Sequence, residues 1–201
     1  MKLFLKLIVI LSNLTLKEDI ITYFWDTWFI IWDITKSISS RQDKMDKTSL
    51  GYELRKTPEK GEGIFATKYF CKGSLVMEGK VLKEMPHNTS HTTQVGVNRW
   101  ILREELAQKV NHSCDPNVGY RDNSVGGMDY FAFKDIHPGD EIVGDYAMGN
   151  YKVDHMPPCK CSALQCRGVI TGWKDLPQDI KTLYKGYHAQ YLLEIDGDAG
   201  N

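Results

Sequence analysis

Residues 111–117 read NHSCDPN. This stretch is polar and rich in turn-forming residues. Asn111 and His112 can offer side-chain and backbone hydrogen bonds to a polar ligand. Cys114 could bind a metal, or it could pair with His112 as a nucleophile. Because no third group that would orient the imidazole is evident, the sequence favours metal binding over thiol catalysis.

Three further cysteines occur in residues 159–166, CKCSALQC, with the spacing C-x-C-x4-C. They are Cys159, Cys161 and Cys166. Three thiols this close together suit three corners of a tetrahedral site, and structural zinc takes four ligands. Cys114 is the best distant candidate for the fourth ligand, with His112 and Cys71 as alternatives. Zinc is favoured over iron–sulfur because no ferredoxin spacing is present. The competing interpretation is free or disulfide-paired thiols, and for Cys71 a small buried side chain is expected.

Two more motifs flank strand-like runs. Residues 60–65, KGEGIF, hold a G-x-G element that does not open a helix, so it is not a dinucleotide-binding fingerprint. Glycine there could still allow a ligand to approach the backbone closely. Residues 139–146, GDEIVGDY, end in an Asp-Tyr pair that would place the phenol of Tyr146 at a sheet edge, where either packing or an active-site role is open.

The remaining pattern from residue 52 onward predicts short strands, with one short helix over 102–110. The expected strands cover residues 52–55, 63–70, 74–82, 118–120, 129–134 and 141–146. Near the C-terminus, Pro177 can open a helix, expected over 175–193. Its apolar stripe should dock on the sheet rather than stack on nucleic-acid bases. That stripe is Ile180, Leu183, Tyr184, Tyr187 and Tyr191. Residues 194–201 are expected to form a frayed acidic tail.

Residues 1–50 differ in composition, since all 17 Gly and 7 Pro lie from Gly51 onward. Turns draw on Gly and Pro, so this segment is interpreted as an N-terminal extension without a part in the chemistry, and Met45 is a plausible true start. A membrane-surface helix is the main alternative. A signal peptide or anchor is less favoured because Lys6, Asp26 and Asp33 interrupt the apolar runs.

The charge balance excludes a generally basic nucleic-acid-binding surface. The 201 residues carry 25 Lys and Arg against 26 Asp and Glu, a net charge of -1. A direct nucleic-acid ligand is therefore not expected. Five cysteines, with three in one metal-like cluster, favour a reducing, intracellular location in the cytoplasm or nucleus.

Together, the four motifs in this order resemble the SET-domain protein-lysine methyltransferases that carry a post-SET zinc loop. The resemblance covers roughly residues 52–173. It implies a mostly β fold of small curved sheets with knot-like threading, a SET domain over 51–150 and a zinc loop over 155–173. It also implies S-adenosylmethionine as methyl donor, and a protein bearing a target lysine as partner and substrate.

By the same resemblance, specific residues take specific roles. Backbone groups of Gly61, Glu62 and Gly63 would line the cofactor, with Asn111 and His112 beside it. Tyr146 would be the catalytic tyrosine, also touching the cofactor, and Trp173 would cover the cofactor or pack in the core. The implied zinc ligands are Cys114, Cys159, Cys161 and Cys166.

Two departures from the family pattern concern the acceptor side of the site. Many members carry an aromatic residue two positions before the catalytic tyrosine, where it helps set how many methyls are added; here that position is Gly144. A further tyrosine expected in the short insert is replaced by residues 91–94. The alternative to an enzyme is therefore a catalytically silent SET-like module that binds a partner protein through its zinc-tied surface.

Overall fold

The computed structural model describes residues 29–36, 50–89, 92–154 and 156–198. The chain divides into two units, Met1–Ser49 and Leu50–Asn201. In the first unit, residues 29–36 form a helix with exposed side chains. Among the described residues, no helix is long and apolar enough to cross a membrane. Lys6, Asp26 and Met45 lie outside the described residues, so the interpretations that rest on them stay predictions.

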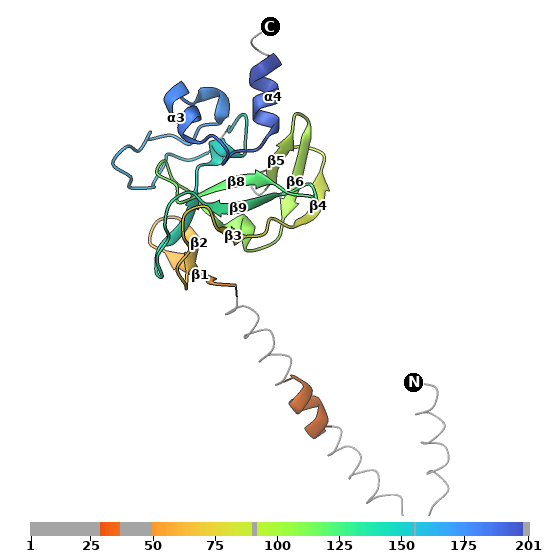
Figure 1. Ribbon diagram of the computed structural model, residues 1–201. Coiled ribbons are helices and arrows are strands. Elements are labelled where there is room, and N and C mark those ends of the chain that lie inside the picture. Colours follow the sequence, from red (N-terminus) through yellow and green to blue (C-terminus); the bar gives the residue numbers. More distant parts are fainter. Residues whose placement is uncertain (1–28, 37–49, 90–91, 155, 199–201) are drawn as a thin grey trace, which may run out of the picture. The chain divides into compact units, whose positions relative to one another are not determined.

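The second unit is built mainly from strands in two sheets (Figure 1). The seven-stranded sheet has the order β1-β2-β10-β8-β9-β3, with β7 paired to β10. Its strands are β1 (Tyr52–Thr57), β2 (Gly61–Ala66), β3 (Leu75–Met77), β7 (Asn111–His112), β8 (Val118–Asp122), β9 (Met128–Ala132) and β10 (Glu141–Gly144). The three-stranded sheet has the order β4-β6-β5, formed by β4 (Val81–Met85), β5 (Thr92–Gly96) and β6 (Arg99–Arg103). The mostly β prediction is confirmed.

Alternation along β9 shows how the larger sheet makes its core. Met128, Tyr130 and Ala132 are buried, whereas the residues between them are half-buried. Successive side chains of a strand point to opposite faces, so this face covers the apolar interior. Ile64 of β2 and Ile142 of β10 are fully buried in the same cluster.

Strand β10 brings distant motifs together. It pairs antiparallel with β2 and parallel with both β7 and β8. Gly144 lies opposite His112 of β7 and Val118 of β8. The Asn117 side chain locks this arrangement, because it donates to Glu141 O and accepts from Val143 N, both at 2.8 Å. The NHSCDPN and GDEIVGDY motifs therefore lie side by side.

The helix predicted over 102–110 is wrong. Leu102 and Arg103 belong to β6, and only Ala107–Lys109 forms a 3-10 turn. β6 is the central strand of its sheet and pairs with β4 on one side and β5 on the other. Strands β5, β6 and β7 were not predicted from the sequence, since the pairing that stabilises them is not local.

The single C-terminal helix predicted over 175–193 is also wrong. Two short helices form instead, α3 (Gln178–Leu183) and α4 (Tyr191–Asp198), and residues 194–198 of the expected tail belong to α4. Gly186 lies between them with φ of 80°, a left-handed conformation that ends a helix. Packing of the stripe is confirmed for Tyr184 and Tyr191, which are buried, but Leu183 is 59% exposed where α3 ends. Knot-like threading stays a prediction.

Candidate active site

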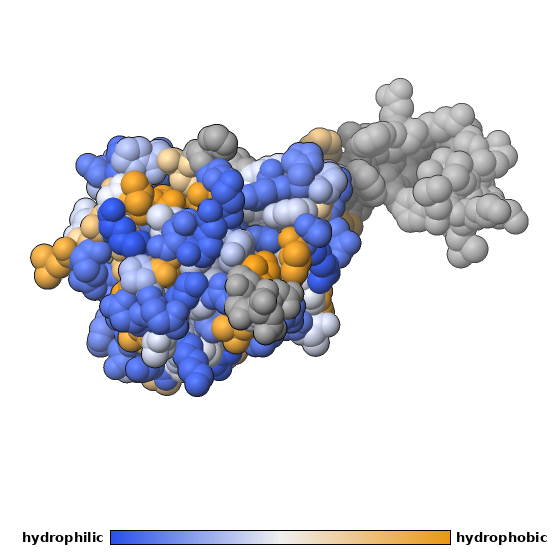
Figure 2. Space-filling view, turned by 90° about the horizontal axis from the view of Figure 1, so that it is seen from above, coloured by the Kyte–Doolittle hydropathy of each residue, from blue (hydrophilic) through white to orange (hydrophobic). Residues whose placement is uncertain are grey.

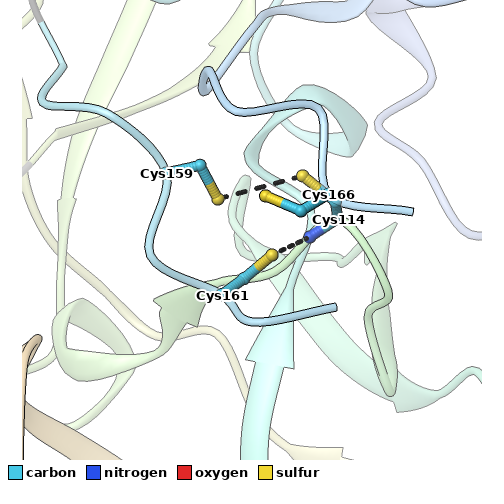
Figure 3. Close-up of side chains that lie close together, drawn as sticks. All are labelled: Cys114, Cys159, Cys161 and Cys166. Atoms are coloured by element: carbon cyan, nitrogen blue, oxygen red, sulfur yellow. Dashed lines mark hydrogen bonds between the residues drawn. The ribbon is translucent and has the colours of Figure 1, made fainter. Parts of the chain in front are cut away.

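Four cysteines converge where the C-terminal loop meets the NHSCDPN stretch (Figure 3). The Sγ atoms of Cys114, Cys159, Cys161 and Cys166 all lie within 4.8 Å of one another. The Cys114 and Cys159 sulfurs are 3.9 Å apart. Sulfurs around a tetrahedral zinc with bonds of about 2.3 Å lie about 3.8 Å from each other. The cluster has the composition and spacing of a four-thiolate metal site.

Backbone amides point at some of these sulfurs, and each such hydrogen bond favours the thiolate form. Burial nevertheless raises the pKa of Cys114 to about 11 and also raises that of Cys159, so the protons are held unequally across the cluster. Cys114 N donates to Cys161 Sγ, and Arg167 N donates to Cys114 Sγ, each at 3.4 Å. Burial alone would raise the pKa of Cys161, yet hydrogen bonds from the Cys114 and Ala163 amides and from neighbouring thiols lower it below its usual range. Thiolate is the form that binds metal.

Because four cysteines lie in the cluster, neither Cys71 nor His112 is needed as a fourth metal ligand. Cys71 lies outside the cluster and is exposed, so its expected burial is wrong. It follows strand-like sequence, but in the structure it sits in a loop after the bridge residue Phe70. His112 adjoins the cluster, with Nε2 3.5 Å from Cys114 Sγ.

A buried carboxylate connects the metal cluster to the tyrosine. Asp145 is fully buried and receives both terminal guanidinium nitrogens of Arg167, at 2.8 and 2.9 Å. Tyr184 OH and Ala147 N donate to it as well, at 3.0 and 3.1 Å. Burial by itself would lower the pKa of Arg167, but its hydrogen bonds to Asp145 raise it, so the guanidinium stays charged.

His112 links this pair to the backbone of Tyr146. Its Nδ1 accepts from Tyr146 N at 3.3 Å and lies 3.6 Å from Asp145 Oδ1. Burial lowers the pKa of His112 to about 4, despite the nearby carboxylate, so the ring is neutral. With Nδ1 accepting, the proton is assigned to Nε2, which faces Cys114 Sγ. His112 therefore spans the distance from the metal cluster to the tyrosine.

Tyr146 lines a cavity of about 400 Å³. Its hydroxyl donates to Val110 O at 3.3 Å, and its ring packs edge-on against His112. Burial raises the pKa of Tyr146, so the hydroxyl stays protonated near neutral pH. Arg103 lines the same cavity. The volume falls in the range of small-molecule sites.

The space beside Gly144, where the sequence lacks an aromatic side chain, is filled from another strand. A Cβ built on Gly144 would lie 2.3 Å from Tyr120 Oη, so the phenol of this β8 residue occupies the place of a side chain at position 144. Tyr120 is buried and lines the cavity beside Tyr146. Thr92 and Thr93 of β5 line it as well, at the other position where a tyrosine was expected.

The G-x-G element lies in β2. Its neighbour Asn111, in β7, donates through Nδ2 to Glu62 O at 2.9 Å and to Glu141 Oε1 at 2.8 Å. A Cβ on Gly63 would lie 2.8 Å from Asn111 Nδ2 and 2.7 Å from Glu141 Oε1, so a larger residue would displace these side-chain ends and disturb their hydrogen bond. Gly61 has φ of 76° and open space where a side chain would be. We call Gly61, Glu62, Gly63 and Asn111 the cradle; at Gly61 the open space leaves the backbone accessible.

Trp173 is placed in the core. It is 1% exposed, and its Nε1 donates to Asp196 of α4 at 2.7 Å. Its ring packs against His188, with centroids 4.7 Å apart. Of the two roles left open by the sequence, core packing accounts for these contacts.

Several residues of the network were not found from the sequence. Asp145 lies within the GDEIVGDY motif, immediately before Tyr146, and Arg167 immediately follows Cys166; these positions are the signal that could have found them. Tyr184 was assigned to packing alone, and its hydroxyl contact with Asp145 spans 39 positions.

Comparison with known proteins agrees with these observations. Residues 61–147 match the family described as SET domain. The histone-lysine N-methyltransferase ash1 of Drosophila melanogaster is 29% identical over 61% of this chain. An H3 lysine-36 specific histone-lysine N-methyltransferase of Emericella nidulans is 39% identical over 71% of it. The chain spans only 6% and 16% of these two proteins.

Solved structures show the same fold. KRYPTONITE, in complex with mCHG DNA and SAH, superposes on 58% of this chain and 28% of its own, with a TM-score of 0.50 and 22% identity. Arabidopsis thaliana SUVH6 in complex with SAM covers 59% of this chain and 32% of its own, with a TM-score of 0.50 and 21% identity. The chain therefore contains a SET domain, and its sequence relatives are histone-lysine methyltransferases.

Proposed function

We propose that this chain transfers methyl groups from S-adenosylmethionine to the ε-amine of lysine in a protein substrate. The observation that carries the proposal is the place of Tyr146. Its neutral phenol lines a cavity, and its backbone amide is held by His112. Positioning is the main requirement of such a reaction, since bringing reactants together in the right geometry supplies much of the rate.

The cradle of Gly61, Glu62, Gly63 and Asn111 would hold the cofactor, together with His112. S-adenosylmethionine, when bound, supplies a methyl group that passes to the amine nitrogen while the sulfur keeps the electrons of the broken bond. The chain's residues must then present a neutral amine. Arg103 lines the cavity, and its positive charge disfavours the charged form of a lysine that enters. The proton can leave to water.

Zinc is the metal we assign to the four cysteines. Four thiolates at tetrahedral spacing leave no open position for a reacting ligand, which is typical of structural zinc. The ligands come from the 114 region and the 159–166 loop, so a bound ion would tie these two segments together. A bound ion would help to keep Arg167 in place, because the Arg167 amide donates to Cys114 Sγ while its guanidinium pairs with Asp145.

For the substrate we propose histone H3, because relatives from Aspergillus oryzae and Emericella nidulans are named for H3 lysine 36. The identities are 40% over 47% of this chain and 39% over 71%. An intracellular location follows from this proposal and stays a prediction.

The test is methyl transfer from tritium-labelled S-adenosylmethionine to H3 peptides and to intact nucleosomes. One peptide spans lysine 36 of the histone and another spans its lysine 9, the two positions for which relatives are named. We expect label on an H3 lysine, and its loss when that lysine is replaced by arginine. Cofactor binding with no transfer to any histone, peptide or other protein would contradict the enzymatic proposal. The second candidate, a silent module that binds a partner protein, would then be favoured.

A further inference from the structure

The short turn that carries Tyr146 begins at a residue held from far along the chain. This turn is the 3-10 helix η2 (Tyr146–Met148), and Asp145 precedes it as its N-cap. The Asp145 carboxylate accepts from Ala147 N at 3.1 Å, which fixes the first turn. Tyr184 OH donates to the same carboxylate at 3.0 Å. The hydroxyl of Tyr184 therefore helps to orient the group that caps the turn.

The other end of the turn is held by the same C-terminal segment. Ala189 N donates to Met148 O at 2.8 Å. Tyr191 OH donates to Gly149 O at 3.0 Å and accepts from Tyr151 N at 3.1 Å. Contacts from this one segment thus bracket η2 on both sides.

Both tyrosines are fixed by burial, and their hydroxyls keep the protons that they donate. Tyr184 is 2% exposed and Tyr191 is 4% exposed. Burial raises the pKa of each phenol, and the Asp145 charge adds to the effect at Tyr184. A buried carbonyl or carboxylate that loses such a donor is left short of a partner, which is costly.

The segment lies outside the part of the chain that matches the family. The match covers residues 61–147, whereas the contacts with η2 come from residues 184–191. They also lie beyond the last cysteine of the metal cluster, Cys166. The C-terminal segment is therefore a separate source of support for the turn that presents Tyr146 to the cavity.

We propose that Tyr184 and Tyr191 are positioning residues for methyl transfer, which clamp η2 and so fix the Tyr146 phenol. The inference rests on the proposed function. Small displacements at a reacting centre cost much of the rate. Neither hydroxyl bonds directly to the cradle or to His112, and Tyr184 reaches His112 only through the Asp145 carboxylate. Loss of the clamp should therefore lower turnover without weakening cofactor binding.

The first experiment compares the parent chain with Tyr184→Phe and Tyr191→Phe, which keep the rings and remove only the oxygens. Turnover on a verified H3 peptide is measured at a temperature well below the thermal midpoint of every variant. The Kd for S-adenosylmethionine is measured on the same preparations. We expect kcat to fall about 5- to 30-fold in each variant. This range lies between the effect of losing a single hydrogen bond and the effect of misplacing a catalytic group. The Kd should stay within about twofold of the parent value.

Tyr187→Phe is the matched control, because Tyr187 lies in the same segment. Its ring packs against Phe133, and no hydrogen bond of its hydroxyl is present among the described residues. It should keep the parent's kcat and Kd. If Tyr184→Phe and Tyr191→Phe both fold and keep the parent's turnover, the proposal is overturned. A rise in Kd as large as the fall in kcat would also overturn it, because the effect would then be on binding.

A second experiment needs no activity and tests the clamp itself by amide hydrogen exchange. The Ala147 amide should exchange faster in Tyr184→Phe than in the parent, and it should be unchanged in Tyr187→Phe. If the Tyr184→Phe variant does not fold, the exchange rate of the Ala147 amide in the parent chain tests the clamp instead. Its Ala147 amide should then be about as protected as that of Ala132, a core-strand amide that donates to Ser74 O at 2.9 Å.

The outcomes separate the clamp from the proposed function. Rapid exchange of Ala147 in the parent, or no change in a folded Tyr184→Phe, would overturn the clamp whatever the substrate proves to be. If the exchange behaves as expected but the parent transfers no methyl group, the proposed function fails. The positioning role would then be overturned with it, and only the contact between the two segments would stand.

Discussion

Asp145 is the residue on which most of the site's contacts meet. Its buried carboxylate accepts hydrogen bonds from Arg167 of the metal loop, from Tyr184 after α3 and from the Ala147 amide. His112 Nδ1 lies 3.6 Å away. A buried carboxylate without its cation is strongly destabilising. Asp145 therefore couples the C-terminal loop to the turn that carries Tyr146.

Arg167→Lys tests that coupling with the charge retained. Lysine cannot reproduce the two parallel hydrogen bonds of a guanidinium, so we expect the free energy of unfolding to fall by about 1–3 kcal/mol. Zinc content should not change, because the residue reaches Cys114 through its backbone amide. Chemical denaturation and elemental analysis measure the two quantities.

Arg55→Lys is the control for this substitution. Arg55 pairs with Glu53 on the surface, both nearly half exposed, and such a pair contributes about 0.5 kcal/mol or less. Equal losses for the two variants would mean that the Asp145–Arg167 pair has no special importance.

Asn111→Ala is expected to weaken cofactor binding before it affects turnover. The Asn111 side chain joins β7 to β2 through Glu62 O and also contacts Glu141, so its loss loosens the proposed cradle. We expect the Kd for S-adenosylmethionine to rise about 5- to 20-fold. Titration calorimetry measures it, with the exposed Asn98→Ala as control. A Kd equal to that of the parent would remove Asn111 from the cofactor site.

At the residue level, local chemistry could be predicted and long-range contacts could not. The tight C-x-C-x4-C spacing limits how those three thiols can be arranged. They could therefore be predicted as metal ligands, with Cys114 as the best candidate for the fourth. The contacts of Tyr184 with Asp145 and of Tyr120 with Gly144 join strands and loops far apart in sequence. Nothing in local spacing encodes them.

Among the elements, the loop of residues 159–166 depends most on its ligands. It holds three of the four cysteines and no strand, and few backbone hydrogen bonds fix it. Binding of structural zinc couples to folding, so chelation should loosen this loop, lower the thermal midpoint and reduce methyl transfer.

Cys114→Ser tests the ligand set. We expect the zinc content of the purified chain to fall well below one ion per chain, because the remaining three thiols lose their fourth partner. Cys71→Ser is the matched control and should keep its zinc, since Cys71 is exposed and outside the cluster. Full zinc occupancy in the Cys114→Ser protein would assign the fourth ligand elsewhere.

Some strands have a local sequence pattern that predicts them, and others do not. β1, β2, β3, β8, β9 and β10 overlap runs that the sequence predicted, and β4 begins at the end of the predicted run 74–82. β5 and β6 carry Thr, Gln, Arg and Trp, and they form because they pair with each other and, for β6, with β4. The C-terminal stripe has helical spacing throughout, yet Gly186 divides it, since local conformation there overrides the apolar period.

For the molecule as a whole, the second unit is expected to fold without the first. The unit Leu50–Asn201 contains both sheets, the cavity and the cysteine cluster. On the described surface in the view of Figure 2, hydrophilic side chains dominate and hydrophobic patches are small and separate.

A chain beginning at Met45 should therefore keep the thermal midpoint, the zinc content and the S-adenosylmethionine affinity of the full chain. Its residues 45–49 precede Leu50, where the second unit begins. Circular dichroism, elemental analysis and calorimetry give the three values. Insolubility or loss of zinc in the shortened chain would show that residues 1–44 contribute to the fold.

The central claim, that Tyr146 is the catalytic tyrosine of a lysine methyltransferase, is tested most directly by Tyr146→Phe. Methyl transfer to a verified H3 peptide and the Kd for S-adenosylmethionine are measured on the same preparation. Removing one oriented polar contact at the reacting centre commonly lowers the rate by about 10² to 10³, so we predict a loss of that size in kcat. The Kd should change less than about threefold, because the hydroxyl acts mainly in the transition state. A Tyr146→Phe enzyme that keeps the parent's turnover would contradict the assignment.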